Sequence, residues 1–225
     1  MNDPNYTPER RPIRSRELTA SKRAGHWLAV RGVSPNAISV AGMVGGIAAG
    51  VAFAFAGRPG MERLAFIAAA VLIQLRLLAN MLDGIVAVER KIASPVGELY
   101  NEVPDRVSDA AILIGAGYAV GSAPLLGALT ACVALFIAYV RAEGKVAGAP
   151  QEFCGPMAKP QRMFVLTLCA LYCGLTPLAW QPWLTIGGQR WGLMAAGLLL
   201  IIVGGLWTSV RRLSRIARAL KQPSS

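Results

Sequence analysis

Residues 36–56 read NAISVAGMVGGIAAGVAFAFA and contain no charged side chain. A helix needs about 20 consecutive, mainly apolar residues to cross the hydrocarbon core of a bilayer, so this stretch predicts a membrane-spanning helix. Five further mainly apolar runs follow it, at residues 64–82, 103–121, 124–140, 163–180 and 191–209. The sequence therefore predicts an all-α fold, an integral membrane bundle of six transmembrane helices.

The composition of the whole chain agrees with a position in lipid. Hydrophobic residues make up 54% of the 225 residues, charged residues only 16%, and the mean hydropathy is +0.47, which is too apolar for a soluble domain of this length. We divide the chain into a cytoplasmic tail with an interfacial helix (1–33), a transmembrane domain (34–210) and a basic cytoplasmic tail (211–225). Apolar and basic residues alternate over 17–31, which predicts an amphipathic helix that lies in the headgroup plane.

The net charge of +11 comes from cations that are segregated by side of the membrane. Lys and Arg cluster before the first apolar run, after the last run, and in the second and fourth loops, whereas the other loops hold only Arg58, Arg63 and Arg190. Because cytoplasmic loops are rich in Lys and Arg, we expect a multi-pass protein of the plasma (inner) membrane with both termini in the cytoplasm. This distribution also argues against nucleic acid as a partner.

Small residues recur in the first run, where Gly42, Gly46 and Gly50 are spaced by four. They predict a smooth helix face on which another helix can approach closely. Such faces serve packing within a chain at least as often as packing between chains, so a homodimer is left open.

Polar residues inside apolar helices are costly, and here they concentrate in residues 80–109, NMLDGIVAVERKIASPVGELYNEVPDRVSD. On a helix, Asn80 and Asp83 share one face. The next helix carries a stripe of residues spaced by four, namely Gly97, Asn101, Asp105 and Asp109. Oxygen-bearing side chains on two adjacent helices can bind a hard divalent cation, so the sequence predicts a metal site at the cytoplasmic surface of the bundle.

This stretch resembles the signature of the CDP-alcohol phosphotransferases, or CDP-alcohol phosphatidyltransferases, a family of membrane enzymes that make phospholipids. The signature reads D-x-x-D-G-x-x-A-R, then eight residues, then G-x-x-x-D-x-x-x-D, on the second and third of six helices. Every spacing is kept in this chain, and the resemblance covers most of its length. In order, the signature positions are Asn80, Asp83, Gly84, Ala87, Val88, Gly97, Asn101 and Asp105.

Three of these positions depart from the signature. Asn80 and Asn101 stand in place of aspartates, and Val88 stands in place of the arginine. Each asparagine keeps a carbonyl oxygen but removes one negative charge, so we expect weaker metal binding. The chain is interpreted as a divergent member of the family, in which three nearby acids are candidates to compensate for the missing charge: Glu98, Glu102 and Asp109.

The resemblance implies transfer of a phosphatidyl group from CDP-diacylglycerol, or a similar CDP-alcohol, to an acceptor hydroxyl with release of CMP. Phosphoryl chemistry needs mainly positioning and charge neutralisation, which a bound Mg²⁺ or Mn²⁺ supplies. By the same resemblance, the metal ligands are Asn80, Asp83, Asn101 and Asp105, the general base is Asp105, and the nucleotide binds beside Gly84, Ala87 and Gly97.

Cations near the fourth loop face the same expected compartment, and we select Arg141, Lys159 and Arg162 as candidates for binding the acceptor. Such cations suit an acceptor that itself carries a phosphate. A phosphorylated polyol, such as glycerol 3-phosphate or an inositol phosphate, is therefore favoured over serine or a neutral alcohol. The alternative is that these cations only set the topology and attract lipid headgroups.

Two other functions stay open. A catalytically inactive relative that acts as the structural partner of a lipid enzyme would keep the fold without turnover. A small-solute transporter would spread ionisable residues through the depth of the membrane, whereas here all but Arg76 cluster at one face. Metal-dependent release of CMP separates the three functions.

Overall fold

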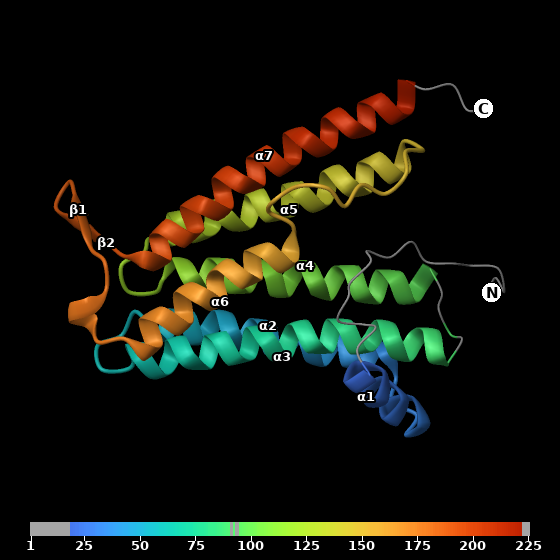
Figure 1. Cartoon of the computed structure of the whole chain (residues 1–225), viewed down its shortest axis with the longest axis horizontal. Helices are drawn as coiled ribbons and strands as arrows, with labels where there is room; N and C mark the ends of the chain where they lie inside the picture. Colours follow the sequence, from blue (N-terminus) through green and yellow to red (C-terminus); the bar gives the residue numbers. More distant parts are fainter. Residues whose placement is uncertain (1–18, 91, 93–94, 222–225) are drawn as a thin grey trace. The chain divides into compact units, whose positions relative to one another are not determined.

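The computed structural model describes residues 19–90, 92 and 95–221 (Figure 1). The helices are α1 (Thr19–Val30), α2 (Pro35–Phe55), α3 (Glu62–Glu89), α4 (Pro95–Gly117), α5 (Pro124–Val146), α6 (Lys159–Leu175) and α7 (Leu193–Lys221). Between α6 and α7 lie a short 3-10 helix, η2 (Leu178–Trp180), and a hairpin of β1 (Leu184–Ile186) and β2 (Gln189–Trp191). The expected tail up to residue 18 and residues 222–225 of the expected basic tail lie outside the described residues.

The helices follow the apolar runs of the sequence, and α1 lies within residues 17–31, where the sequence predicts a helix; its place in the headgroup plane stays a prediction. In the described part of the chain, α2, α3, α5 and α7 are long and apolar enough to cross a membrane, which confirms an all-α membrane fold. Helix α4 carries five charged side chains, and α6 has only 17 residues. A span by these two helices, and hence the count of six, stays a prediction.

Prolines mark several helix boundaries. Pro35 and Pro124 stand at the first residues of α2 and α5, where proline is tolerated because its missing N–H has no intrahelical partner. The fifth apolar run was expected to continue to residue 180, but α6 ends at Leu175. Thr176 is extended, with φ −96° and ψ 147°, as is favoured for a residue that precedes a proline.

The chain divides into two compact units, residues 1–48 with 72–108 and residues 49–71 with 109–225. In the first unit, glycines let α2 approach both α3 and α4. A Cβ at Gly42 would lie 3.0 Å from the Cβ of Ala79, and one at Gly46 would lie 2.4 Å from the Cβ of Ser108. Only glycine fits at Gly46 without displacement of α4, so the expected role of these glycines in close packing is confirmed.

Helix α1 is attached to the end of α3 in the same unit. A Cβ at Gly25 would lie 2.3 Å from a side-chain carbon of Ile85, and His26 contacts the Glu89 carboxylate at 2.5 Å. Arg90 donates hydrogen bonds to the backbone carbonyl oxygens of Gly32 and Val33, at 3.3 and 3.2 Å. The connection between α1 and α2 is thereby held against the end of α3.

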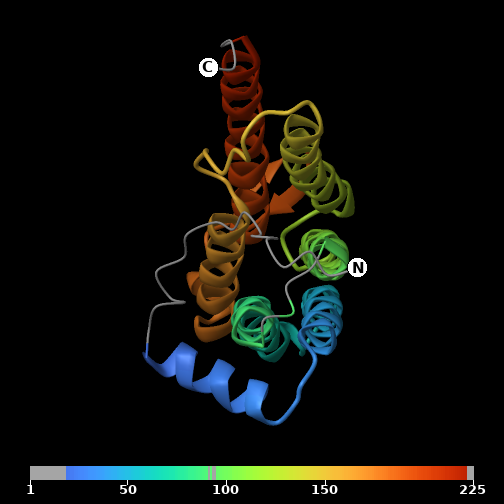
Figure 2. The same cartoon turned by 90° about the vertical axis from the view of Figure 1, so that its right-hand side faces the viewer.

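In the second unit, α5 and α7 lie side by side (Figures 1 and 2). A Cβ at Gly205 would lie 2.5 Å from Val133, and one at Gly144 would lie 2.5 Å from Ile216. The closest approach is between backbones of α2 and α4, where a Cβ at Gly115 would lie 2.1 Å from the carbonyl oxygen of Gly50. Close packing of helix on helix is thus the main structural use of glycine in this unit.

The hairpin between α6 and α7 was not expected from the sequence. Its two turn residues, Gly187 and Gly188, have φ of 60° and 80°, the backbone region that a two-residue hairpin turn requires and that glycine adopts at little cost. The Gly-Gly pair between two short segments is the signal that predicts such a hairpin.

Candidate active site

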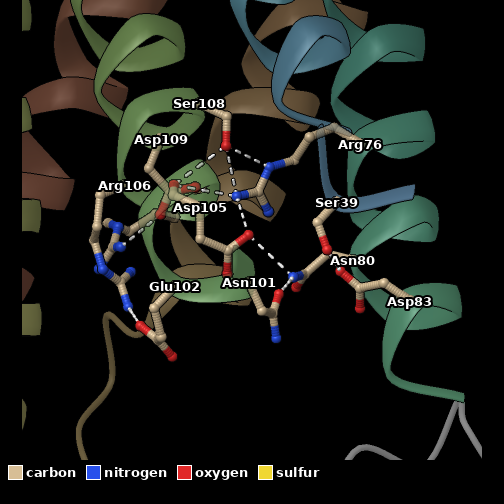
Figure 3. Close-up of polar contacts among 11 residues, drawn as sticks. Ser39, Arg76, Asn80, Asp83, Asn101, Glu102, Asp105, Arg106, Ser108 and Asp109 are labelled. Carbon is tan, nitrogen blue, oxygen red and sulfur yellow. Dashed lines mark hydrogen bonds and ion pairs between the residues drawn. The ribbon is translucent and has the colours of Figure 1, made fainter. Parts of the chain in front are cut away.

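The polar residues of the expected site gather in the first unit, where α3 and α4 face each other (Figure 3). Arg76, Asn80 and Asp83 are four and three residues apart on α3, so their side chains leave the same face of the helix. Asn101 and Asp105 are four residues apart on α4 and face them. Asn80 of the first predicted stripe is thus brought to Asn101 and Asp105 of the second.

Asn80 is the centre of this cluster. Its side-chain nitrogen Nδ2 donates one hydrogen bond to Asn101 Oδ1 and another to Asp105 Oδ1, both at 3.0 Å. An aspartate at this position would have no N–H to donate. The asparagine that departs from the family signature thus joins the two oxygen-bearing residues of α4.

Asp83 is bound from the side of α2. Its carboxylate is buried, with the residue 3% exposed, and its Oδ2 accepts a hydrogen bond from Ser39 Oγ at 2.6 Å. Ser39 comes close to Asp83 because Gly42 and Gly46 have no side chains that would keep α2 away from α3 and α4. The role of Ser39 was not expected, and only the packing of α2 reveals it.

Arg76 is the second residue that the sequence did not assign to the site. It is 2% exposed, and its Nη2 donates to Asp105 Oδ1 at 2.8 Å and to the Asp105 carbonyl oxygen at 3.2 Å. Ser108 Oγ accepts from Nη2 at 2.7 Å and from Nε at 2.9 Å. The position of Arg76, four residues before Asn80, is the signal that places it on the same face.

The donor set of this cluster decides which metal it fits. Asp83 and Asp105 supply carboxylates, and Asn80 and Asn101 supply amide oxygens, all of them hard donors of the kind that Mg²⁺ and Mn²⁺ prefer. Among the described residues, no group of three or more Asp, Glu, His or Cys side chains could hold a metal ion. A metal ion at this cluster would therefore depend on amide oxygens as well as on carboxylates.

The other signature residues lie around the cluster. Gly84 is buried and Ala87 is half-buried on α3, and Gly97 is half-buried on α4. Val88, in place of the signature arginine, is 59% exposed. Glu89 and Arg90, which follow it, are engaged with α1 and with the connection that follows α1, so they do not replace that arginine in this structure.

The three candidate compensating acids lie on α4. Glu98 is half-buried near its start. Glu102 forms an ion pair with Arg106, one turn further along the same helix. Asp109, which belongs to the second unit, is 2% exposed and forms an ion pair with Arg162. Glu102 and Asp109 are therefore each bound to a cation of the chain itself.

The expected acceptor residues all belong to the second unit. Arg162 is 2% exposed; it donates to the Met157 carbonyl oxygen at 3.1 Å and to Asp109 Oδ2 at 3.2 Å. Arg141 is half-buried, with its guanidinium 5.5 Å from the ring centre of Phe153. Lys159 is half-buried at the first residue of α6. The contacts of Arg162 indicate a structural role.

The fold and the site define a class: an α-helical membrane protein in which two adjacent helices bring carboxylates and amides together at one point. The family follows from comparison with known sequences. The chain belongs to the CDP-alcohol phosphatidyltransferase family, whose model matches residues 32–208. The resemblance seen in the signature is thereby confirmed, and with it the classification as a membrane-bound transferase of phospholipid synthesis.

The similar proteins include phosphatidylinositol phosphate synthases and a protein named by its location in the inner membrane. Phosphatidylinositol phosphate synthase of Mycobacterium tuberculosis is 24% identical over 194 residues, which cover 83% of this chain and 85% of that protein. The synthase of Streptomyces avermitilis is 26% identical over 198 residues, covering 85% and 75%. Inner membrane protein YnbA of Escherichia coli is 24% identical over 186 residues, covering 83% and 85%.

Solved structures show the same fold. The crystal structure of the Mycobacterium tuberculosis synthase with CDP-DAG bound matches with a TM-score of 0.71 at 18% identity. The match covers 92% of this chain and 100% of the synthase chain. The structure of the same synthase with manganese and citrate has a TM-score of 0.70 at 19% identity and covers 91% and 93%.

Proposed function

We propose that the chain transfers a phosphatidyl group from CDP-diacylglycerol, or a similar CDP-alcohol, to the hydroxyl of an acceptor and releases CMP. The observation that carries the proposal is the convergence of Asn80, Asn101 and Asp105 at hydrogen-bonding distance, with Asp83 on the same face of α3. The family and the CDP-DAG bound to a protein of the same fold support it.

The reaction is a displacement at phosphorus. The acceptor oxygen forms a new bond to the phosphorus that carries the diacylglycerol, and the bond from that phosphorus to the bridging oxygen of the diphosphate breaks, so CMP leaves with the electron pair. Asp105 takes the proton of the acceptor hydroxyl as the general base. Arg76 and Asn80 both donate to Oδ1 of this carboxylate, which orients it for that task.

A divalent cation, Mg²⁺ or Mn²⁺, would be held by Asn80, Asp83, Asn101 and Asp105. When bound, it neutralises the charge that develops on the diphosphate. Ser39 holds the Asp83 carboxylate in place from α2. The small residues Gly84, Ala87 and Gly97 would leave room for the nucleotide next to these ligands.

For the acceptor we propose a phosphorylated polyol, bound through Lys159 and Arg141, which are both half-buried and thus partly accessible. Replacing Lys159 with glutamine should raise the KM for the acceptor more than the KM for the CDP-lipid, because the proposed contact of Lys159 is with the acceptor phosphate and not with the CDP-lipid. Equal effects on both KM values would indicate a general structural role instead.

The topology that we propose follows from the charge distribution. All of α2 to α7 would span the plasma membrane, with both termini in the cytoplasm. The polar face of α4 would then be turned toward the interior of the bundle, where charged residues in membranes are found. The glycine face of α2 is used for packing within the chain, so a homodimer stays a prediction, which light scattering of the purified protein in detergent tests.

The proposed function is tested by CMP release from CDP-diacylglycerol in the presence of Mn²⁺, with glycerol 3-phosphate, inositol phosphate and serine as acceptors. Asp83→Asn and Asp105→Asn should each abolish turnover, because these are the two acidic signature positions of the chain. Glu143→Gln is the matched control, since it removes an exposed acid of α5. Full activity of both aspartate variants at unchanged expression would rule out the mechanism.

A second candidate is an inactive relative that is the structural partner of a lipid enzyme. It is favoured by one observation, that Asp105 is engaged by Arg76 and Asn80 of the same chain. No release of CMP by the wild-type protein with any acceptor would support this candidate. A transporter is less favoured, because Arg76 is bound to Asp105 and Ser108 in the first unit.

A further inference from the structure

The buried cation at Arg76 has no counterpart in the family signature as it lies on this sequence, yet it contacts the last aspartate of that signature. Its guanidinium donates to the carboxylate and to the carbonyl oxygen of Asp105, and Ser108 Oγ accepts from two of its nitrogens. With 2% of the residue exposed, the positive charge is held in one place, next to the oxygen that a metal ligand would use.

We infer that the buried guanidinium of Arg76 neutralises the charge of Asp105, as a metal ion would. The site therefore binds a single divalent cation. The inference rests on the proposed function only in that the same residues hold the cation. It adds a positioning residue and a metal stoichiometry, which the family signature does not contain.

The charges of the site support this inference. The signature has four aspartates, whereas this chain keeps two of them, Asp83 and Asp105. Arg76 adds one positive charge at 2.8 Å from Asp105, which leaves a formal charge of minus one. One divalent cation already overcompensates that charge, and a second would face net repulsion, because affinity for such ions depends on the number of ligand charges.

The hydrogen bonds of Asn80 support it independently. The Nδ2 group of Asn80 joins Asn101 Oδ1 to Asp105 Oδ1, each at 3.0 Å. A cation shared by α3 and α4 would join the same oxygens. The amide of Asn80 and the guanidinium of Arg76 therefore join oxygens of α4 as one metal ion of a carboxylate cluster would. The one cation that binds would use the carboxylates of Asp83 and Asp105 and the amide oxygens of Asn80 and Asn101.

The test is the number and affinity of Mn²⁺ ions bound to the purified full-length protein in detergent, measured from the EPR signal of free Mn²⁺. The wild type should bind one ion per chain. Arg76→Gln should bind Mn²⁺ more tightly, on the order of tenfold, because a neighbouring positive charge is gone. Arg76→Lys keeps the charge and should bind one ion with wild-type affinity.

Several outcomes would overturn the inference: two ions per wild-type chain, no bound ion up to millimolar Mn²⁺, or equal affinity in Arg76→Gln and the wild type. The wild-type stoichiometry needs no variant, so it decides the matter even where Arg76→Gln fails to fold. CMP release measured on the same preparations separates this inference from the proposed function. One bound ion without CMP release would leave the inference standing and reject the proposed function.

Discussion

Replacing Arg162 with methionine distinguishes a structural from an acceptor-binding role for a residue that the sequence assigns to the acceptor. In the second unit, the Arg162 and Asp109 side chains are each 3% exposed and 3.2 Å apart. Arg162 also donates to the Met157 carbonyl oxygen. Methionine fills similar space but removes both hydrogen bonds and leaves the Asp109 carboxylate buried beside an apolar side chain.

The expected loss of stability follows from these contacts. Removing one partner of a buried ion pair costs about 3–5 kcal/mol, because the remaining buried charge loses that partner. The carbonyl oxygen that loses its donor adds about 1 kcal/mol or more. The total, on the order of 5 kcal/mol, is a large part of the roughly 5–15 kcal/mol by which a typical protein is stable.

The assay is equilibrium unfolding in detergent micelles, followed by tryptophan fluorescence. Arg211→Met, which removes an exposed cation of α7, is the control and should change the free energy of unfolding by less than about 1 kcal/mol. The double variant Arg162→Met with Asp109→Leu should recover most of the loss, because neither charge is then left alone. Wild-type stability of Arg162→Met, together with a raised KM for the acceptor, would refute the reasoning.

Three further predictions follow from packing, topology and burial. Gly50→Ala should destabilise the fold by about 2 kcal/mol, because the new Cβ would lie 2.3 Å from a backbone carbonyl oxygen. Gly45→Ala is the control and should leave stability unchanged, because nothing lies within 4 Å of a Cβ there. Thermal unfolding compares the two variants. Reporter fusions after Gly148 and at the C-terminus should register as cytoplasmic and one near Gly188 should not, and an external C-terminus would contradict the six-span topology. Burial, together with the neighbouring Glu152 carboxylate, raises the pKa of the Cys154 thiol. Alkylation of Cys154 should therefore reach its half-maximal rate at a higher pH than alkylation of a free thiol. The same pH midpoint for both thiols would contradict this prediction.

The existence and approximate limits of the helices could be predicted from the sequence. Their signal is local, since a run of apolar residues and a proline at its start decide where a helix begins, as at Pro35 and Pro124. The facing stripes of Asn80 and Asp105 were also predictable, because the spacing of residues along a helix determines which of them share a face.

The tertiary structure alone decided which partner each polar side chain has. Ser39 reaches Asp83 across 44 positions, Arg76 reaches Ser108 across 32, and Arg162 reaches Asp109 across 53. These pairings depend on the rotation and close approach of whole helices, which periodicity along one helix does not specify. The sequence by itself determined that this protein is a helical membrane protein with the spacing of a CDP-alcohol phosphatidyltransferase signature. Only the packing of α2, α3 and α4 decided that Arg76 and Ser39 contact the two aspartates of that signature.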